Sequence, residues 1–134
     1  MVLMFNWPAV AVAMVLGVFL QFLWYMKPVL GGTWQRLSNL DDATLTQGAM
    51  PRIGLALGCS FATAWCLAGF FNFIRPGDFM QGSLAGLQLF LGLVLPAMAT
   101  EHIFARRPPL LLLINTAPVG LAMLLQGGLL AAWK

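Results

Sequence analysis

Charged residues are scarce in this sequence, and long stretches of it contain none. Only 8% of the 134 residues are Asp, Glu, Lys or Arg, whereas an average soluble domain has about 25%, and 60% of the residues are hydrophobic. A small soluble domain leaves a large share of its chain exposed to water, so a chain of this length cannot hide that much apolar surface. The composition therefore excludes a water-soluble globular domain.

Four charge-free stretches are each long enough to cross a lipid bilayer. The hydrocarbon core of a bilayer is about 30 Å thick and a helix rises about 1.5 Å per residue, so about 20 apolar residues suffice to cross it. We therefore predict an all-α integral membrane protein, a four-transmembrane-helix bundle that forms a single membrane domain over residues 1–134. The approximate spans are 7–26, 53–74, 79–100 and 109–133.

The first loop is the only sizeable segment outside these spans. Residues 31–37 are expected to form a short helical turn on the membrane surface, and Asp41 is placed to cap a second short helix that runs to Thr46. The fold prediction therefore includes a short interfacial segment between the first and second membrane helices.

Cysteine is nearly absent, and no motif for catalysis or cofactor binding stands out. Cys59 and Cys66 are seven residues apart in the second span, about 10 Å along one helix face, which exceeds the Cα separation of about 7 Å that a disulfide tolerates. We interpret both as small packing residues. No catalytic residue, cofactor or metal ligand is predicted, and we expect that the protein is not an enzyme.

The few basic residues favour one orientation in the membrane. The loops after the first and third spans lie on one side and carry five of them, whereas the other side carries two. Because short cytoplasmic loops are enriched in Lys and Arg, we predict a multi-pass protein of the bacterial inner membrane with loops 1 and 3 cytoplasmic and both termini periplasmic. Membrane lipid, and not nucleic acid, is the expected partner of these charges. The five are Lys27, Arg36, Arg52, Arg106 and Arg107, and the two are Arg75 and Lys134.

Small residues recur at four-residue spacing in every span, where they allow helix backbones to approach closely. We expect these edges to pack the bundle. We also expect some of them to remain for another subunit, in a homo-oligomer or in a larger complex of membrane protein subunits. The small residues that we predict to pack helices are Ala13 and Gly17, Gly54 and Gly58, Gly82 and Gly86, and Gly120.

Polar and aromatic residues, most of them near the span ends, are the candidates for a functional role. Glu101 and His102 are the acidic and imidazole groups closest to membrane depth, and an ionisable residue there is a functional hypothesis by default. An interfacial ion pair is the favoured explanation of Glu101, with a proton or ion site as the alternative, while His102 either faces the lipid headgroups or is functional. Pro96, about one turn earlier, is expected to kink the third helix. The full set of candidates is Gln21, Trp24, Tyr25, Glu101, His102, Arg107 and Asn115.

The order of several residues along the chain resembles a known family. They are Asn6-Trp7, Gly17, Trp24-Tyr25, and Gly32 with Trp34 in the first half, and Gly86, Gly92, Pro96, Arg107-Pro108, Ile114-Asn115 and the terminal Ala-Ala-Trp in the second. This pattern is similar to that of the domain-of-unknown-function 1761 family of small bacterial four-span membrane proteins, from which the chain departs at Lys27-Pro28 and Glu101-His102. The resemblance implies the same fold and topology. The family has no assigned reaction or ligand, so the resemblance implies no function.

Three classes of function fit the sequence. The leading one is a non-catalytic structural or accessory subunit, because uncharged spans with small-residue edges and short loops are what a packing element needs. A small-solute or ion transporter or channel is the alternative, since neutral polar residues such as Gln88 and Asn115 supply polar groups within the spans. A lipid-headgroup enzyme ranks third, because it would rest on Glu101, His102 and the two arginines after them, a cluster without a nucleophile.

Overall fold

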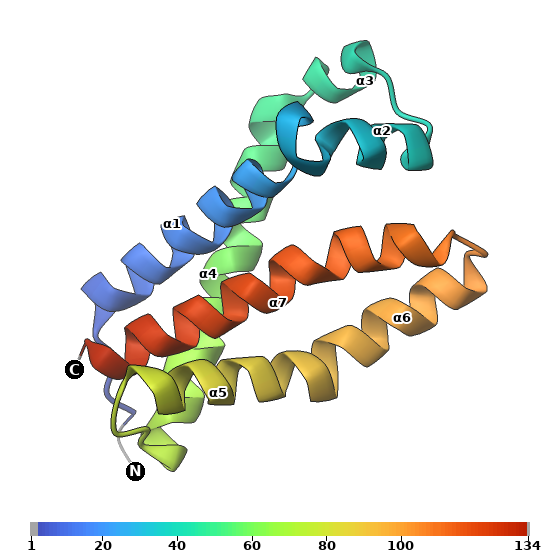
Figure 1. The fold of residues 1–134 in the computed structure, drawn as a ribbon. Helices are drawn as coiled ribbons and strands as arrows, with labels where there is room; N and C mark the ends of the chain where they lie inside the picture. Colours follow the sequence, from blue (N-terminus) through green and yellow to red (C-terminus); the bar gives the residue numbers. More distant parts are fainter. Residues whose placement is uncertain (1–2, 134) are drawn as a thin grey trace.

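The computed structural model describes residues 3–133, and all regular structure in that part of the chain is helical (Figure 1). Four helical segments in it are long and apolar enough to cross a membrane, which confirms the predicted four-helix membrane protein. They are α1 (Trp7–Trp24), α4 (Ala49–Ile74), the continuous run of α5 (Phe79–Leu89), η2 (Phe90–Val94) and α6 (Leu95–Phe104), and α7 (Pro109–Ala132).

The helices differ from the predicted spans mainly at their ends. α4 begins before the predicted span and includes Arg52, and α6 continues past Glu101 to Phe104. A long charged side chain near a helix end reaches the headgroup level without interrupting the helix, so a boundary drawn at the first charge ends the helix too early. α1 is shorter than predicted because Met26, with a ψ of 141°, is extended.

The third membrane-crossing segment bends where α5 meets α6. Between them, η2 has the wider hydrogen-bond spacing of a π-helix, and the Leu95 N–H donates to the carbonyl oxygen of Phe90. Pro96 follows directly and has no N–H to donate, so the ordinary helical bond at this position cannot form. Figure 1 shows the change of direction between the two helices. The bend lies where the sequence predicts a kink, and the π-helical turn accounts for it.

α7 is the central helix of the bundle. Within its most apolar stretch 50% of the residues are buried, compared with 17–22% in the other three segments. α1, α4 and α5 all pack against it. Gly82 of α5 lies against the carbonyl group of Gly127, and Gly86 lies against that of Met123, so a side-chain carbon on either glycine of α5 would overlap the α7 backbone. The two helices therefore meet backbone to backbone, as small residues permit.

Other small residues close the contacts of α1 and η2 with their neighbours. Ala13 of α1 is fully buried in one apolar cluster with Ala64 of α4. Gly120 of α7 lies against the ring of Phe90, which a Cβ at that position would overlap. Gly17 occupies a three-helix junction that is described with the polar side chains around it below.

Gly54 and Gly58 of α4 face open space among residues 3–133. Both lie in the exposed N-terminal half of α4, and a Cβ added to either would meet no atom within 4 Å. α4 faces α1 and α7 instead through Ser60, Ala64 and Leu67, which lie on another face of the helix and are buried. In the described part of the chain the two glycines therefore do not bring α4 close to another helix, contrary to the expectation of packing within the bundle, and their contact with another subunit stays a prediction.

The segment between α1 and α4 forms three short helices at one end of the bundle (Figure 1). Asp41 caps the last of them as the sequence predicts, because its Oδ1 accepts a hydrogen bond from the Thr44 N–H at 2.7 Å. Lys27 donates to Asp42 Oδ2 at 2.8 Å and Gln35 donates to Asp42 Oδ1 at 2.9 Å, so this carboxylate ties the start of the segment to its end. The three helices are η1 (Lys27–Gly31), α2 (Gly32–Ser38) and α3 (Asp42–Thr46).

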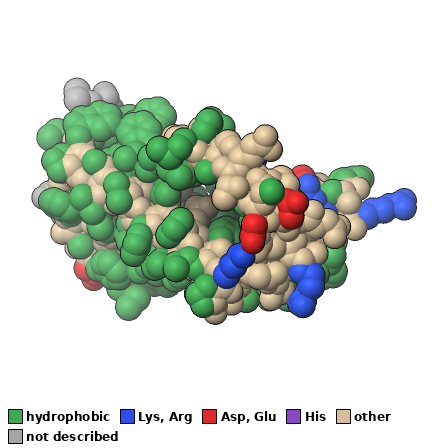
Figure 2. All heavy atoms as spheres, turned by 90° about the horizontal axis from the view of Figure 1, so that it is seen from above, with side chains coloured by type: hydrophobic (Ala, Val, Ile, Leu, Met, Phe, Trp, Pro, Cys, Tyr) green, Lys and Arg blue, Asp and Glu red, His purple; other side chains and the backbone are tan. Residues whose placement is uncertain are grey.

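Charged side chains gather at the end of the molecule that carries these short helices. Figure 2 shows the molecule from above the view of Figure 1, and most of the acidic and basic side chains visible there lie over the half that holds α2, α3 and the α6–α7 turn. The other half of this face is largely hydrophobic. Large apolar side chains such as Phe22, Leu93 and Phe104 are exposed on the helices. A charged end and apolar sides are what a bundle that crosses a membrane requires.

Candidate functional site

Four candidate residues named from the sequence meet at the charged end, between α1, α6 and α7. The Tyr25 hydroxyl, directly after α1, donates to Asn115 Oδ1 at 3.2 Å. The side-chain nitrogen of Asn115 lies 3.4 Å from His102 Nε2. His102 Nδ1 lies 3.1 Å from the carbonyl oxygen of Met98 and 3.3 Å from Glu101 Oε2. One chain of polar contacts therefore runs from the end of α1 through α7 to α6.

The partners of His102 fit an imidazole that carries its proton on Nδ1. A carbonyl oxygen only accepts, so Nδ1 donates to Met98, and the Asn115 amide donates to the unprotonated Nε2. The His102 side chain is only 4% exposed. The hypothesis that it faces the lipid headgroups is therefore wrong, because the ring lies between α6 and α7 and joins them through Asn115.

Glu101 lies in an ion pair at the end of α6. Its Oε1 is 3.4 Å from Arg107 Nη2, and the two side chains are 58% and 47% exposed. An exposed pair of this kind contributes less than about 1 kcal/mol to stability. Arg107 follows a tight turn in which Arg106 has a left-handed φ of 52° and the Arg107 N–H donates to the carbonyl oxygen of His102 at 3.1 Å. The turn places two consecutive arginines beside the polar chain.

A cavity of about 660 Å³ lies between α2 and the α6–α7 turn. Its walls carry polar and cationic groups from the turn and apolar groups from α2 and α7. The Trp34 ring of α2 lies against that of Tyr25, with 5.0 Å between the ring centroids. The cavity thus offers an anion cationic and hydrogen-bonding groups, with aromatic and aliphatic surface alongside. Its lining includes Tyr25, Trp34, Leu37, Arg106, Arg107 and Asn115.

Two further candidate residues do not line this cavity. Trp24 Nε1 donates to the carbonyl oxygen of Ile114 at 3.0 Å, which fastens the end of α1 to α7. Gln21, about one turn earlier on α1, is half-buried and lines neither this cavity nor the second one described below. The position of a residue within a span does not show which neighbouring helix it contacts. The sequence therefore groups Trp24 and Gln21 with the candidates that meet at the charged end.

A separate polar junction lies inside the membrane-crossing region. Gln126 of α7 is 1% exposed, and its Nε2 donates to the carbonyl oxygen of Ala13 at 2.8 Å and to Ser60 Oγ at 3.1 Å. Ser60 Oγ in turn donates to the carbonyl oxygen of Met14 at 2.7 Å. Gly17 makes room for both side chains, which a Cβ there would overlap. These bonds link α1, α4 and α7 and pair polar groups that lipid would leave unpaired.

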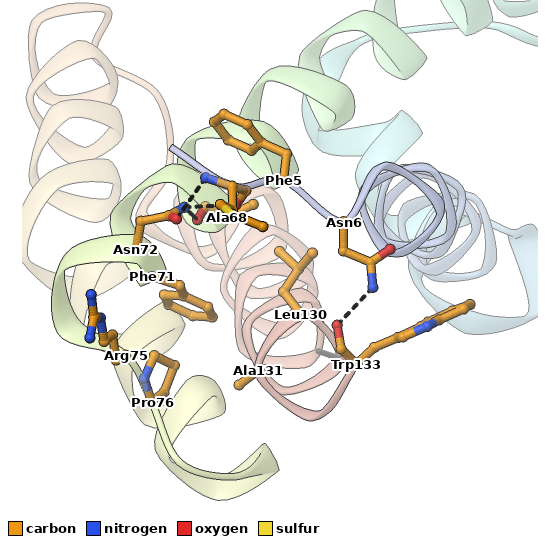
Figure 3. A pocket seen from close by; sticks show the side chains of 11 residues that line it. Phe5, Asn6, Ala68, Phe71, Asn72, Arg75, Pro76, Leu130, Ala131 and Trp133 are labelled. Atoms are coloured by element: carbon orange, nitrogen blue, oxygen red, sulfur yellow. Dashed lines mark hydrogen bonds between the residues drawn. The ribbon is translucent and has the colours of Figure 1, made fainter. Parts of the chain in front are cut away.

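A second cavity, of about 670 Å³, lies at the opposite end of the bundle (Figure 3). Asn72 of α4 accepts a hydrogen bond from the Met4 N–H at 2.9 Å and donates to the Met4 carbonyl oxygen at 3.1 Å. Asn6 Nδ2 donates to the carbonyl oxygen of Trp133 at 3.1 Å, so the two described ends of the chain are joined there. Figure 3 shows Arg75 at one side of this cavity.

The sequence does not identify this second cavity. Its hydrogen-bonded pairs are 68 and 127 residues apart, and no spacing along the chain marks such contacts. The available signals were Asn72 as a polar residue inside the second span and Asn6 immediately before α1. Each residue is also explained by a contact with its own helix. Asn6 Oδ1 caps α1, and Asn72 also donates to the carbonyl oxygen of Ala68.

Metal-binding side chains do not cluster in the described part of the chain. Within residues 3–133, no group of three or more His, Cys, Asp or Glu is placed to hold a metal ion. Cys59 and Cys66 are free thiols on the exposed face of α4. The phenol at the charged-end cavity, Tyr25, is bonded to an amide and not to a base. The chemistry that this cavity offers is charge pairing and hydrogen bonding.

The four apolar helices and their charged end define the chain as a multi-pass helical membrane protein. Residues 8–131 match the family described as protein of unknown function (DUF1761), and the chain belongs to that family. The resemblance found in the sequence is therefore confirmed, and the match covers nearly the whole length of all four spans. No curated protein and no solved structure matches the chain.

Proposed function

We propose that this protein is a non-catalytic structural or accessory subunit of a membrane assembly. The observation that carries the proposal is the junction of Gln126, Ser60 and Gly17. In transporters, polar groups near the middle of the membrane line the path of the solute. Here such groups donate to each other and to backbone carbonyl oxygens of α1, which holds three helices together. Polar side chains used in this way support a packing role.

The exposed face of α4 supports a contact with another subunit. Gly54, Gly58 and Ala62 lie at four-residue spacing on this helix and are all exposed. Rows of small residues let the helices of separate subunits approach closely in lipid, where no hydrophobic effect drives them together. We infer that a helix of another copy or of a different membrane protein packs on this face.

We also propose the bacterial inner membrane as the location, with α2, α3 and the α6–α7 turn in the cytoplasm. The charged end carries five basic residues, whereas Arg75 lies at the other end of the bundle. Because Lys and Arg are enriched in short cytoplasmic loops, this asymmetry supports an orientation with both chain ends in the periplasm.

Extraction of the full-length protein from its native membrane in mild detergent tests the assembly. We expect a discrete stoichiometric partner to co-purify with the wild type and to be lost from Gly58→Leu, because the added side chain separates the two helices. Gly92→Leu is the matched control, since Gly92 also has open space around it but lies on η2. A wild-type protein that is purely monomeric would contradict the proposal. A homo-oligomer without other subunits would fit the contact on α4 but would favour transport over an accessory role.

Transport of a small solute or ion is the second candidate. The chain of contacts from Tyr25 through Asn115 to the buried His102 favours it, because relays of polar side chains that include His carry protons in pumps and transporters. This chain reaches the exposed carboxylate of Glu101. A flux measurement that separates the two candidates at Glu101 is given in the Discussion.

A further inference from the structure

The cavity between α2 and the α6–α7 turn has an excess of positive charge. Among residues 3–133, no carboxylate lies within salt-bridge distance of Arg106, and Arg107 has one such partner, Glu101, at 3.4 Å. Lys27, at the same end of the bundle, is paired with Asp42 at 2.8 Å. The two arginines therefore line the cavity, and one carboxylate, that of Glu101, pairs with Arg107 alone.

The turn carries Arg106 where the backbone favours glycine. Its φ of 52° lies in the left-handed region, which a residue with a Cβ adopts at some cost. The conformation ends α6, because the Arg107 N–H donates to the carbonyl oxygen of His102 as at many helix C-termini. Arg106 and Arg107 both line the cavity. Guanidinium groups bind phosphate oxygens through paired, charge-assisted hydrogen bonds, so the chemistry here suits a phosphate.

The surroundings of the cavity suit an amphiphile rather than a purely polar anion. The rings of Trp34 and Tyr25, tilted by 55° to each other, lie in its wall, and such aromatic rings settle at the headgroup level of a bilayer. The adjoining first turns of α7 expose Leu110 and Leu113, which are 51% and 62% accessible. A ligand with its phosphate at the arginines can therefore lay its apolar part along α7 in the bilayer.

We propose that this cavity binds the phosphate headgroup of an anionic phospholipid, with Arg106 and Arg107 as its cationic ligands. A volume of about 660 Å³ holds a headgroup, while the acyl chains stay in the membrane. Basic pockets between membrane helices are a recurrent way of holding anionic lipids. A packing subunit needs no such ligand, so the site goes beyond the proposed function. The bound lipid fills the space between α2 and the α6–α7 turn.

Native mass spectrometry of the full-length protein in detergent tests the site, with phosphatidylglycerol and phosphatidylcholine of identical acyl chains as probes. Both lipids contain a phosphate, but only phosphatidylglycerol has a net negative charge. With the two at equal concentration, the wild type should retain phosphatidylglycerol in preference. Arg106→Gln should reduce this preference about fivefold, the share of one arginine near an anionic surface, and Arg106→Gln/Arg107→Gln should reduce it further.

Arg36→Gln is the matched control, because Arg36 is an exposed arginine of α2 that does not line the cavity. It should keep the wild-type preference. Equal retention of both lipids by the wild type, an unchanged preference in the double variant, or an equal loss in the control would each overturn the site. Arg106→Gln breaks no salt bridge among the described residues, so its circular dichroism should match the wild type and a lost preference reports binding.

Soluble phosphates show whether the cavity binds a lipid headgroup or a free phosphate. Glycerol phosphate and inorganic phosphate, each added at millimolar concentration, should leave bound phosphatidylglycerol in place, because they lack the acyl chains that hold the lipid in the bilayer-facing part of the site. Displacement by either compound would show that the cavity takes a soluble phosphate ligand, and the lipid assignment would then be wrong.

Discussion

Gln126 of α7 donates a hydrogen bond to the backbone carbonyl oxygen of Ala13 in α1, 113 residues earlier in the chain, at a distance of 2.8 Å. The same side-chain nitrogen also donates to Ser60 of α4. The last long helix is thereby joined to the first two at one buried point. α5 packs against α7 as well, so α7 connects the first two long helices to the third membrane-crossing segment.

Gln126→Leu should destabilise the bundle by about 1 kcal/mol. The substitution replaces the amide with an apolar group and removes two hydrogen bonds, and such bonds between membrane helices each contribute about 0.6 kcal/mol. Unfolding in detergent, followed by tryptophan fluorescence, measures the change. Gln88→Leu is the control, because Gln88 is exposed on α5. A loss of similar size in the control would show that the effect is not due to the junction.

Gly86→Leu should destabilise the bundle by at least about 2 kcal/mol, since its side chain must displace the α7 backbone at Met123. Gly54→Leu should leave the stability of the single chain nearly unchanged, because a Cβ at Gly54 meets no atom within 4 Å. Thermal unfolding of the two variants in detergent compares them directly. If both variants unfolded at the wild-type temperature, the contact of α5 with α7 would not limit stability.

The orientation prediction is tested by single cysteines at positions 36 and 75, in a chain whose own cysteines, Cys59 and Cys66, are replaced by serine. An impermeant thiol reagent applied to intact cells should label position 75 and leave position 36 unlabelled, because Arg36 lies at the end with more basic residues. Cell lysis should then expose position 36 to the reagent. Labelling of position 36 alone in intact cells would reverse the proposed orientation.

Acid should loosen the interfacial segment between α1 and α4. The hydrogen bonds from Lys27 and from Gln35 lower the pKa of Asp42 below its usual value, and a hydrogen bond with Thr44 does the same for Asp41. A lowered folded pKa means that each carboxylate stabilises the segment above the unfolded pKa of about 3.9 and ceases to do so as the pH falls through the folded value. The protection of the α3 amides against hydrogen exchange, corrected for the pH dependence of the intrinsic exchange rate, should therefore decrease below about pH 4.

Asp42→Asn should show faster exchange of the α3 amides at neutral pH and a smaller further change in acid, because one of the two titrating groups is gone. Asp78→Asn is its control at the other end of the bundle, where Asp78 caps α5 and an asparagine preserves the cap. If Asp42→Asn kept the full acid response of the wild type, the loosening would come from other groups.

The membrane fold was predictable because it depends on the length of the four apolar stretches and on their lack of charge. Four uncharged stretches cross the bilayer whatever their partners are, and local chemistry placed the cap at Asp41 and the kink near Pro96. Which helix faces which neighbour was not predictable. Small residues lie on every span, yet Gly86 lies against the α7 backbone, while a Cβ at Gly58 would meet no described atom within 4 Å. Spacing within one helix contains no information about the angle at which the next helix arrives.

The candidate site was predictable as a set of residues but not as an arrangement. Polarity near the span ends selected Tyr25, Glu101, His102 and Asn115, and the structure brings these four together. The cavity beside them depends on how α2 folds back over the α6–α7 turn. That placement is a tertiary contact between segments about 70 residues apart, which no local pattern of the sequence encodes.

Substitution of Glu101 distinguishes the proposed structural role from transport. As a member of an exposed ion pair with Arg107, it contributes less than about 1 kcal/mol, so Glu101→Gln should keep the fold and its partners almost unchanged. As a coupling carboxylate, it would be essential, and its neutralisation would abolish a proton- or cation-dependent flux. Vesicles that contain the wild type, Glu101→Gln or the control Asp78→Asn, with a pH gradient across the membrane, measure that flux. We expect no flux with any of the three proteins, whereas a wild-type flux that persists in Asp78→Asn and vanishes in Glu101→Gln would replace the packing role with transport.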